Sequence, residues 1–233
     1  MYIKLSLTKK ESNMVRNCFL LSLAVRLLAL VLAVATIALI FPLSVSAESP
    51  HTFTLTANPQ FIDCLARFPG DPARRPVATV TITRGNLNDT LVLKLKNIKP
   101  KLSFDLFTVQ HSNLDADGLP DINFVNFGLA WYQSDIEVTS GGTAKVKIQT
   151  ILLDQIFGFD PASSLAPTNT FHVGFWFNDP KDAAACGFVG TTPFNGTHDA
   201  GPLAMISLPD PVTNLGPLCT NPNTSTIPAT CNP

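Results

Sequence analysis

Ala78-Thr-Val-Thr-Ile-Thr83 and Leu91-Val-Leu-Lys-Leu-Lys96 decide the fold class of this chain. In both segments apolar residues recur at every second position. Successive side chains of a β-strand point to opposite faces of its sheet, so this period buries one face and leaves the other in water. Arg84-Gly-Asn86, between the two segments, is typical of a turn. Lys145 to Gln149 repeats the alternation with Val146 and Ile148. These segments predict an antiparallel sheet with one solvated face.

Other segments extend the β pattern along most of the chain. We predict further strands at residues 53–57, 102–110, 128–134, 171–178 and 203–207. About eight short strands separated by turn residues predict an all-β fold, a single antiparallel β-sandwich of Ig-like or Greek-key type. No long amphipathic helix competes, although residues 151–157 and 181–186 are suited to a turn or two of helix.

The first 47 residues have the layout of an export signal. Five lysines and arginines precede an apolar run from Leu27 to Leu43, and Ser44-Val-Ser-Ala47 then supplies small residues for cleavage. An uncleaved membrane anchor is the alternative, because the run is just long enough to span a bilayer. We therefore expect an N-terminal signal or anchor helix (1–47), a β-sandwich domain (48–215) and an irregular, Pro- and Thr-rich tail (216–233).

Cleavage after Ala47 changes the charge of the chain. The full chain of 233 residues has a formal net charge of −1, and the leader holds five basic residues and Glu11. The remaining 186 residues therefore carry 11 basic and 16 acidic side chains, net −5. This charge repels phosphate backbones, and no basic run with interleaved aromatic residues is present, so we expect no nucleic-acid partner.

The four cysteines that follow the leader predict two disulfides in an exported chain. Of the three possible connectivities we favour Cys219–Cys231, which closes the tail, with Cys64–Cys186, which ties an early loop to a late one. Free buried thiols are the alternative in a compartment that does not oxidise them. The absence of CxxC spacing argues against a zinc or thioredoxin-type site.

Asn113-Leu-Asp-Ala-Asp-Gly-Leu-Pro-Asp121 resembles a calcium-binding loop. Ligand oxygens are expected from Asn113, Asp115, Asp117, the Leu119 carbonyl and Asp121, with Gly118 at the sharp turn. Phe124 stands where an EF-hand has its bidentate Glu, so weak Ca²⁺ binding is expected, with a Kd of ~10⁻⁴ to 10⁻³ M. The alternative is an acidic loop whose Asp side chains cap its own turns.

A second candidate site is aromatic. On the strand at 171–178, alternation places Phe171, Val173, Phe175 and Phe177 on one face and His172 and Trp176 on the other. If the second face is open, His172 and Trp176 form a platform for a sugar ring or an apolar ligand. The alternative is that the aromatic residues pack in the core.

Evidence for catalysis is weak. The four histidines have no HxH or HExxH spacing, and the chain has neither a GxSxG elbow nor a phosphate-binding glycine loop. An enzyme would have to assemble its site from loops around His111, His172 or His198. Two of these histidines meeting each other, or a carboxylate, in a pocket would support that possibility.

Three strings carry a resemblance to known sequences. Trp131-Tyr-Gln-Ser-Asp135, Phe171-His-Val-Gly-Phe-Trp-Phe-Asn-Asp-Pro180 and Thr192-Pro-Phe-Asn-Gly196 are similar to uncharacterised secreted β-sandwich proteins of bacteria. The resemblance implies a secreted protein and brings no activity with it. A fainter, architectural resemblance links the chain to chordin-type and copper–zinc superoxide dismutase sandwiches, but the metal-binding histidine cluster is absent.

The leading hypothesis is an exported, non-enzymatic binding or structural module, stabilised by Ca²⁺ if the acidic loop binds it. We expect it to be secreted or held at the extracytoplasmic surface, with a glycan or cell-surface partner. Contact with a membrane is expected only through an uncleaved leader. The alternative is a secreted hydrolase or metal-dependent enzyme with a loop-assembled site.

Overall fold

The computed structural model describes residues 49–154, 156–157, 168–169, 171–190, 192–194 and 198–232. The predicted leader, residues 1–47, lies outside these ranges, and so does the signal or anchor helix expected there. Within the described ranges no helix has the length and apolar character needed to cross a membrane.

The alternating segments form one half of the main sheet. Strands β1 (His51–Ala57), β2 (Val77–Thr83), β3 (Asp89–Lys96) and β6 (Ala144–Thr150) pair antiparallel in the order β1-β2-β3-β6. The alternating apolar residues of both strands are buried, whereas Lys94 and Lys96 are exposed; the buried residues are Ala78, Val80 and Ile82 of β2 and Leu91, Leu93 and Leu95 of β3. The period of two therefore predicts the buried face of these strands correctly.

The other half contains the more apolar strands β12 (Leu203–Ile206), β9 (His172–Phe177), β4 (Ser103–Val109) and β5 (Ala130–Glu137), in that order. Every residue of β9 and β12 is buried. Both faces of β9 are covered, because Val173, Phe175 and Phe177 belong to the main core and Trp176 to a second apolar cluster. This double burial explains why the segment is almost continuously apolar.

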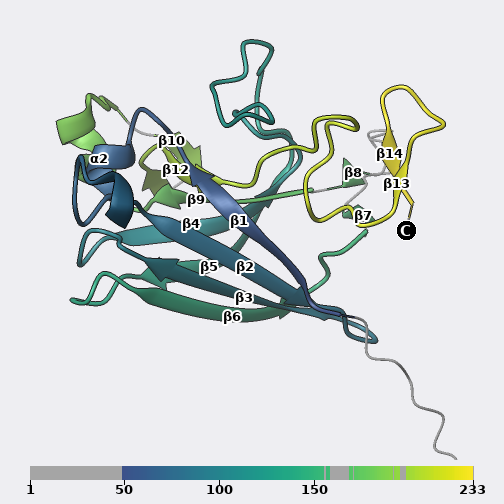
Figure 1. Ribbon diagram of the computed structural model, residues 1–233, viewed down its shortest axis with the longest axis horizontal. Helices are drawn as coiled ribbons and strands as arrows, with labels where there is room; N and C mark the ends of the chain where they lie inside the picture. The colour runs from purple at the N-terminus through teal and green to yellow at the C-terminus, as the bar shows by residue number, and fades with distance from the viewer. Residues whose placement is uncertain are drawn as a thin grey trace, which may run out of the picture. The chain divides into compact units, whose positions relative to one another are not determined.

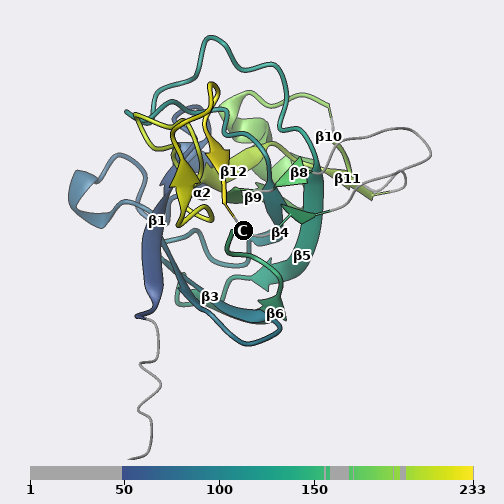
Figure 2. The same cartoon turned by 90° about the vertical axis from the view of Figure 1, so that its right-hand side faces the viewer.

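The two halves join into one antiparallel sheet of eight strands in the described part of the chain. At its end β1 leaves β2 and pairs with β12, Thr56 opposite Ile206 and Ala57 opposite Met205. The edge strands β5 and β6 contact each other, so the sheet nearly closes on itself (Figures 1 and 2). The all-β, antiparallel prediction is confirmed. The two separate sheets of a β-sandwich are not seen among the described residues. The sequence pattern did not reveal this difference, because alternation specifies which face of a strand is buried and not which strands pair.

The main core lies between the two halves. Phe104 packs against Phe175 and Phe177, with ring centroids 4.9 and 5.3 Å apart. Val80 and Leu93 contribute to the same cluster from the opposite half. Burying each such side chain contributes about 1.5–3 kcal/mol to folding.

Short elements complete the structure. The helices are α2 (Ile62–Leu65) and two 3-10 helices, Pro72–Arg74 and Pro180–Cys186. The second 3-10 helix matches the helical turn expected at 181–186. The prediction of a helical turn at 151–157 is wrong. Residues Ile151 to Asp154 are not helical, and β7 (Ile156–Phe157) pairs with β8 (Thr168–Asn169). The remaining short strands are β10 (Thr192–Phe194), β11 (His198–Ala200), β13 (Pro222–Asn223) and β14 (Thr230–Cys231).

The tail is more ordered than its composition suggests. Leu218 is fully buried in the main core, and β13 and β14 form a small hairpin. The Leu218 backbone also exchanges hydrogen bonds with Phe171 and Asp154. The residues expected to form an irregular tail are therefore anchored to the rest of the domain by packing and by backbone hydrogen bonds.

Candidate functional site: the His172 pocket

A pocket of about 320 Å³ lies where the β4–β5 loop meets β9 and the segment after β12. We call it the His172 pocket. Its polar lining comes from two histidines, one carboxylate, one hydroxyl and three side-chain amides: His111, Ser112, Asp121, Asn123, Asn126, His172 and Asn214. Its apolar lining is Leu114, Phe124, Val125 and Pro209. These residues come from three segments that are far apart in the sequence, so only the fold brings them together.

His172 is the most tightly fixed polar side chain of the pocket. It is the first residue of β9 and is 1 % exposed. Its Nδ1 lies 3.0 Å from the carbonyl oxygen of Ser207 and 3.1 Å from its hydroxyl. Because the carbonyl oxygen can only accept, the first contact places the imidazole proton on Nδ1. Nε2 is then the unprotonated ring nitrogen, whose lone pair is able to accept a hydrogen bond or bind a metal ion.

Burial keeps this ring neutral. Desolvation, helped by the nearby charge of His111 and opposed by the bond to Ser207, lowers the pKa of His172 from 6.5 to about 4. At neutral pH the side chain therefore presents a lone pair and no positive charge. Such a group recognises hydroxyl and N–H donors and does not attract anions.

The face of β9 that carries His172 and Trp176 is not an open platform. Trp176 is 1 % exposed and packs edge-on against Phe107 and Phe127, with ring centroids 5.4 and 5.1 Å away. Phe127 in turn contacts Phe124, which lines the pocket. The prediction of a two-residue ligand platform is corrected: of the two side chains, only His172 lines the pocket, whereas Trp176 is buried against Phe107 and Phe127.

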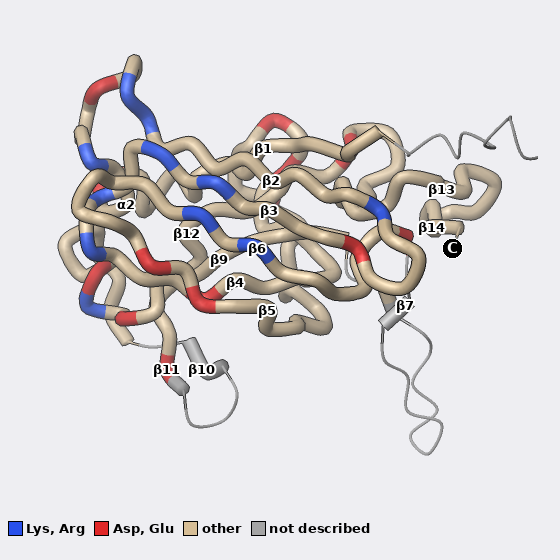
Figure 3. Tube along the Cα trace, turned by 90° about the horizontal axis from the view of Figure 1, so that it is seen from below, with Lys and Arg blue, Asp and Glu red and all other residues tan. Residues whose placement is uncertain are grey.

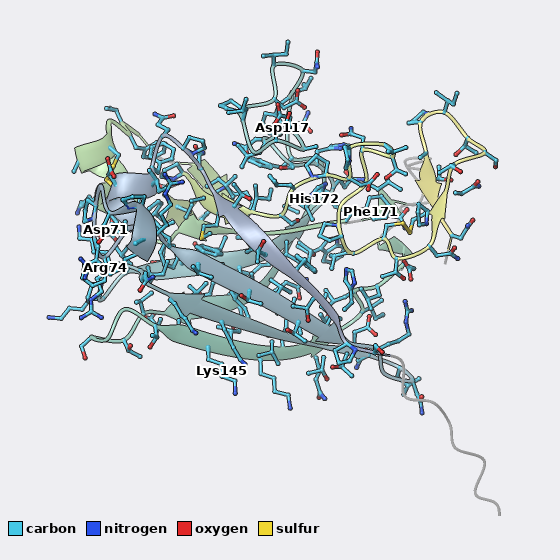
Figure 4. All side chains as sticks on the ribbon, viewed as in Figure 1. Asp71, Arg74, Asp117, Lys145, Phe171 and His172 are labelled. Carbon is cyan, nitrogen blue, oxygen red and sulfur yellow. A yellow bond between two sulfur atoms is a disulfide. The ribbon has the colours of Figure 1, made fainter. Side chains whose placement is uncertain are left out.

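The acidic loop from Asn113 to Asp121 makes turns that use its own side chains. Asp115 Oδ1 accepts hydrogen bonds from the N–H groups of Asp117 and Leu119, at 3.0 and 2.9 Å. The Leu119 carbonyl accepts from Asp115 N. Asn113 Oδ1 is buried and has no hydrogen-bond partner among the described residues. Figure 4 shows Asp117 on the part of the loop that stands away from the sheet, above His172.

These hydrogen bonds are those expected if the loop is an acidic loop whose Asp side chains cap its own turns, which is the alternative to a calcium site. Among the described residues the carboxylate oxygens of Asp115, Asp117 and Asp121 do not all come within 4.8 Å of one another. A cation bound there would have to draw them together, so calcium binding stays a prediction.

Both favoured disulfides are confirmed. The Cα atoms of Cys64 and Cys186 are 6.1 Å apart, and those of Cys219 and Cys231 are 5.8 Å apart. The first bond ties α2 to the 3-10 helix after β9, and the second closes the tail hairpin. Two disulfides are consistent with an oxidising, extracytoplasmic compartment.

Asp154 is a structural carboxylate that sequence analysis does not single out. It is buried, and its Oδ2 accepts from Arg84 Nη2 at 2.6 Å and from Thr220 Oγ1 at 2.5 Å. Burial alone would raise the pKa of Asp154, but the hydrogen bonds from Thr220 and Arg84 outweigh it and lower the pKa. Asp154 lies beside Cys219 and Cys231, which are bonded to each other, so we interpret this group as a clamp that holds the tail.

Other predicted positions are less informative. His111 is exposed and lines the pocket, together with His172 and Asp121. The side chain of His198 lies outside the described part of the structure. Ser207, Asn214 and Phe124 were not predicted as site residues, because no local motif marks residues that meet only through the fold.

The sequence matches no protein-family model, and a search of curated proteins finds no relative.

Proposed function

We propose that the protein is an exported, non-enzymatic binding module that holds a small hydroxyl-rich ligand, such as the end of a glycan, in the His172 pocket. The two disulfides and the signal-like leader support export. The observation that carries the proposal is the fixed, neutral imidazole of His172 at the wall of a polar pocket.

The lining suits sugar hydroxyl groups. His172 Nε2 accepts hydrogen bonds, the amides of Asn126 and Asn214 both donate and accept, and the carboxylate of Asp121 accepts. Phe124 supplies an apolar surface against which the C–H face of a sugar ring packs. Pockets that combine a few convergent polar groups with an aromatic side chain are typical small-molecule sites.

Calorimetric titration with glucose, galactose, mannose and N-acetylglucosamine tests the proposal. At least one sugar is expected to bind, and tryptophan emission is expected to change through the Phe124–Phe127–Trp176 contacts. His172→Asn should abolish binding, because an amide replaces the Nδ1 donor to Ser207 but offers no Nε2 acceptor. Phe124→Ala should weaken binding, whereas Glu137→Gln, at an exposed position on β5, should not change it.

Two results would contradict the proposal: no heat with any sugar, or sugar binding that survives both His172→Asn and Phe124→Ala. The folding of each variant is checked by its urea midpoint, so that lost binding is not confused with unfolding.

A metal-dependent secreted hydrolase is the second candidate, because His111, His172 and Asp121 border the same pocket. In the described residues their ligand atoms do not all lie within 4.8 Å of one another, which favours the binding module. Zn²⁺ titration distinguishes the two: stoichiometric binding that is lost in His111→Gln, with hydrolysis of an ester substrate, would favour the enzyme.

A further inference from the structure

Four lysines share the outer face of β3 and β6. Lys94 and Lys96 alternate with buried leucines on β3, and Lys145 and Lys147 alternate with Ala144, Val146 and Ile148 on β6. All four side chains are exposed. We call this surface the lysine face. Figure 3 shows its basic positions along the two strands, and in Figure 4 Lys145 extends from the side of the molecule opposite Asp117.

The arrangement of these lysines opposes folding. The register places Lys94 directly opposite Lys145, and like charges in that position destabilise a sheet. Within the described residues none of the four lysines forms an ion pair. On β5, Asp135 accepts a hydrogen bond from the Tyr132 hydroxyl. The face thus gathers four of the 11 basic residues that follow the leader, in a domain whose net charge is −5.

Protection of a sheet edge accounts for only half of this pattern. Lysines on an exposed edge strand prevent pairing with other chains, and β6 is an edge strand. However, β3 is flanked by β2 and β6, so Lys94 and Lys96 protect no edge. Edge protection therefore does not explain Lys94 and Lys96, which lie exposed on the outer face of an interior strand.

We propose that the lysine face binds a polyanionic polysaccharide. The lysines repeat at about 6.4–6.8 Å along each strand and about 5 Å between strands, which presents a regular row of charges to an extended polymer. Thr79 and Thr81 on the adjacent β2, together with Gln149 on β6, add hydrogen-bonding groups on the same face. This site is separate from the His172 pocket and does not depend on it.

A lipid surface fits the face less well. Peripheral membrane binding combines basic residues with apolar side chains that insert between the lipids. Among the described residues of β2, β3 and β6, Val77 is the only large apolar side chain that is exposed, at 41 %. A polysaccharide requires no insertion.

The test measures binding of the protein purified after export to immobilised heparin, which carries sulfate, and to polygalacturonate, which carries carboxylate. Dextran serves as the neutral control. Binding to at least one polyanion, weakened by salt, is expected, and comparison of the two identifies the preferred acid group. In Lys94→Gln/Lys145→Gln, affinity at low salt should fall roughly tenfold, and the slope of log affinity against log salt should fall by about two.

The matched control is Arg75→Gln/Lys181→Gln, which removes the same charge from exposed positions elsewhere. It should bind like wild type, and an equal loss of affinity in both variants would overturn the proposal. The urea midpoint of the Lys94→Gln/Lys145→Gln variant should stay the same or rise, because a repulsive pair has been removed. No binding to either polyanion, or binding only to phosphatidylglycerol vesicles, would also overturn it.

Discussion

The two disulfides should contribute unequally to stability, and the difference follows from their loops. Cys64 and Cys186 are 122 residues apart in the sequence, whereas Cys219 and Cys231 are 12 apart. A disulfide restricts the unfolded chain more when it closes a longer loop. The loop-entropy relation gives about 5 kcal/mol for the first bond and about 3 kcal/mol for the second. The two loops do not overlap, so neither bond changes the loop length of the other.

We therefore expect Cys64→Ala/Cys186→Ala to lower the free energy of unfolding by about 2 kcal/mol more than Cys219→Ala/Cys231→Ala does. Burial acts in the same direction, because Cys64 belongs to the main core whereas Cys219 and Cys231 are partly exposed. The tail also keeps its other anchors, Leu218 and the hydrogen bonds to Asp154.

Urea unfolding at pH 7, followed by tryptophan emission, measures both losses, and the buried Trp176 reports on the folded state. Domains of this kind are stable by about 5–15 kcal/mol, so the measurement is best made at low temperature. The reduced wild-type protein should be less stable than either variant. An equal loss in the two variants, or a larger loss for the tail pair, would refute the argument from loop entropy.

Four other outcomes are expected. The pKa of His172 is about 4 in the folded protein and 6.5 in the unfolded chain, so the unfolded state binds a proton first as the pH falls. The free energy of unfolding should therefore decrease by about 3 kcal/mol between pH 6.5 and pH 4. Urea midpoints across this range should show that loss, and the His172→Asn variant should not. Arg84→Ala leaves the buried Asp154 without its cation and should cost about 2 kcal/mol in urea unfolding, whereas Arg74→Ala, whose partner Asp71 lies partly exposed at the surface (Figure 4), should leave the urea midpoint almost unchanged; equal effects would contradict the clamp. Calorimetric titration with Ca²⁺ should show weak binding that is lost in Asp115→Asn/Asp117→Asn, and no heat at millimolar Ca²⁺ would end the calcium hypothesis. Mass spectrometry of the exported protein should find Glu48 at its N-terminus, and an intact leader would indicate a membrane-tethered form instead.

The strands were predictable because their signal is local. The alternation of apolar and polar residues at Ala78–Thr83 and Leu91–Lys96 predicts which side chains face the core, and this prediction does not depend on which strand pairs with each segment. The same reasoning placed Val173, Phe175 and Phe177 together on one face of β9. The helical turn expected at residues 151–157 was wrong, because the Leu152 and Leu153 N–H groups donate to the carboxylate of Asp89 and are therefore not available for helical hydrogen bonds.

The candidate site was only partly predictable. His111, His172 and Asp121 were each recognised as chemically capable, but no spacing in the sequence indicated that they line one pocket. The burial of Trp176 was equally hidden, because it depends on Phe127, which lies in a loop about fifty residues away. No sequence pattern marked Asp154 as a structural residue, because its partners Arg84 and Thr220 are about 70 residues before and after it in the sequence.

By itself, the sequence determined that this chain builds antiparallel strands with one wet face and which four cysteines are available for two bonds. It also placed four lysines on one side of two strands, because side chains alternate along a strand at every position. The tertiary structure alone decided that β1 crosses from β2 to β12 and draws the sheet nearly closed. It likewise decided that His172 reaches a pocket while Trp176 is covered. Pairing and enclosure depend on contacts between distant segments, and a local pattern specifies faces without specifying which segments meet.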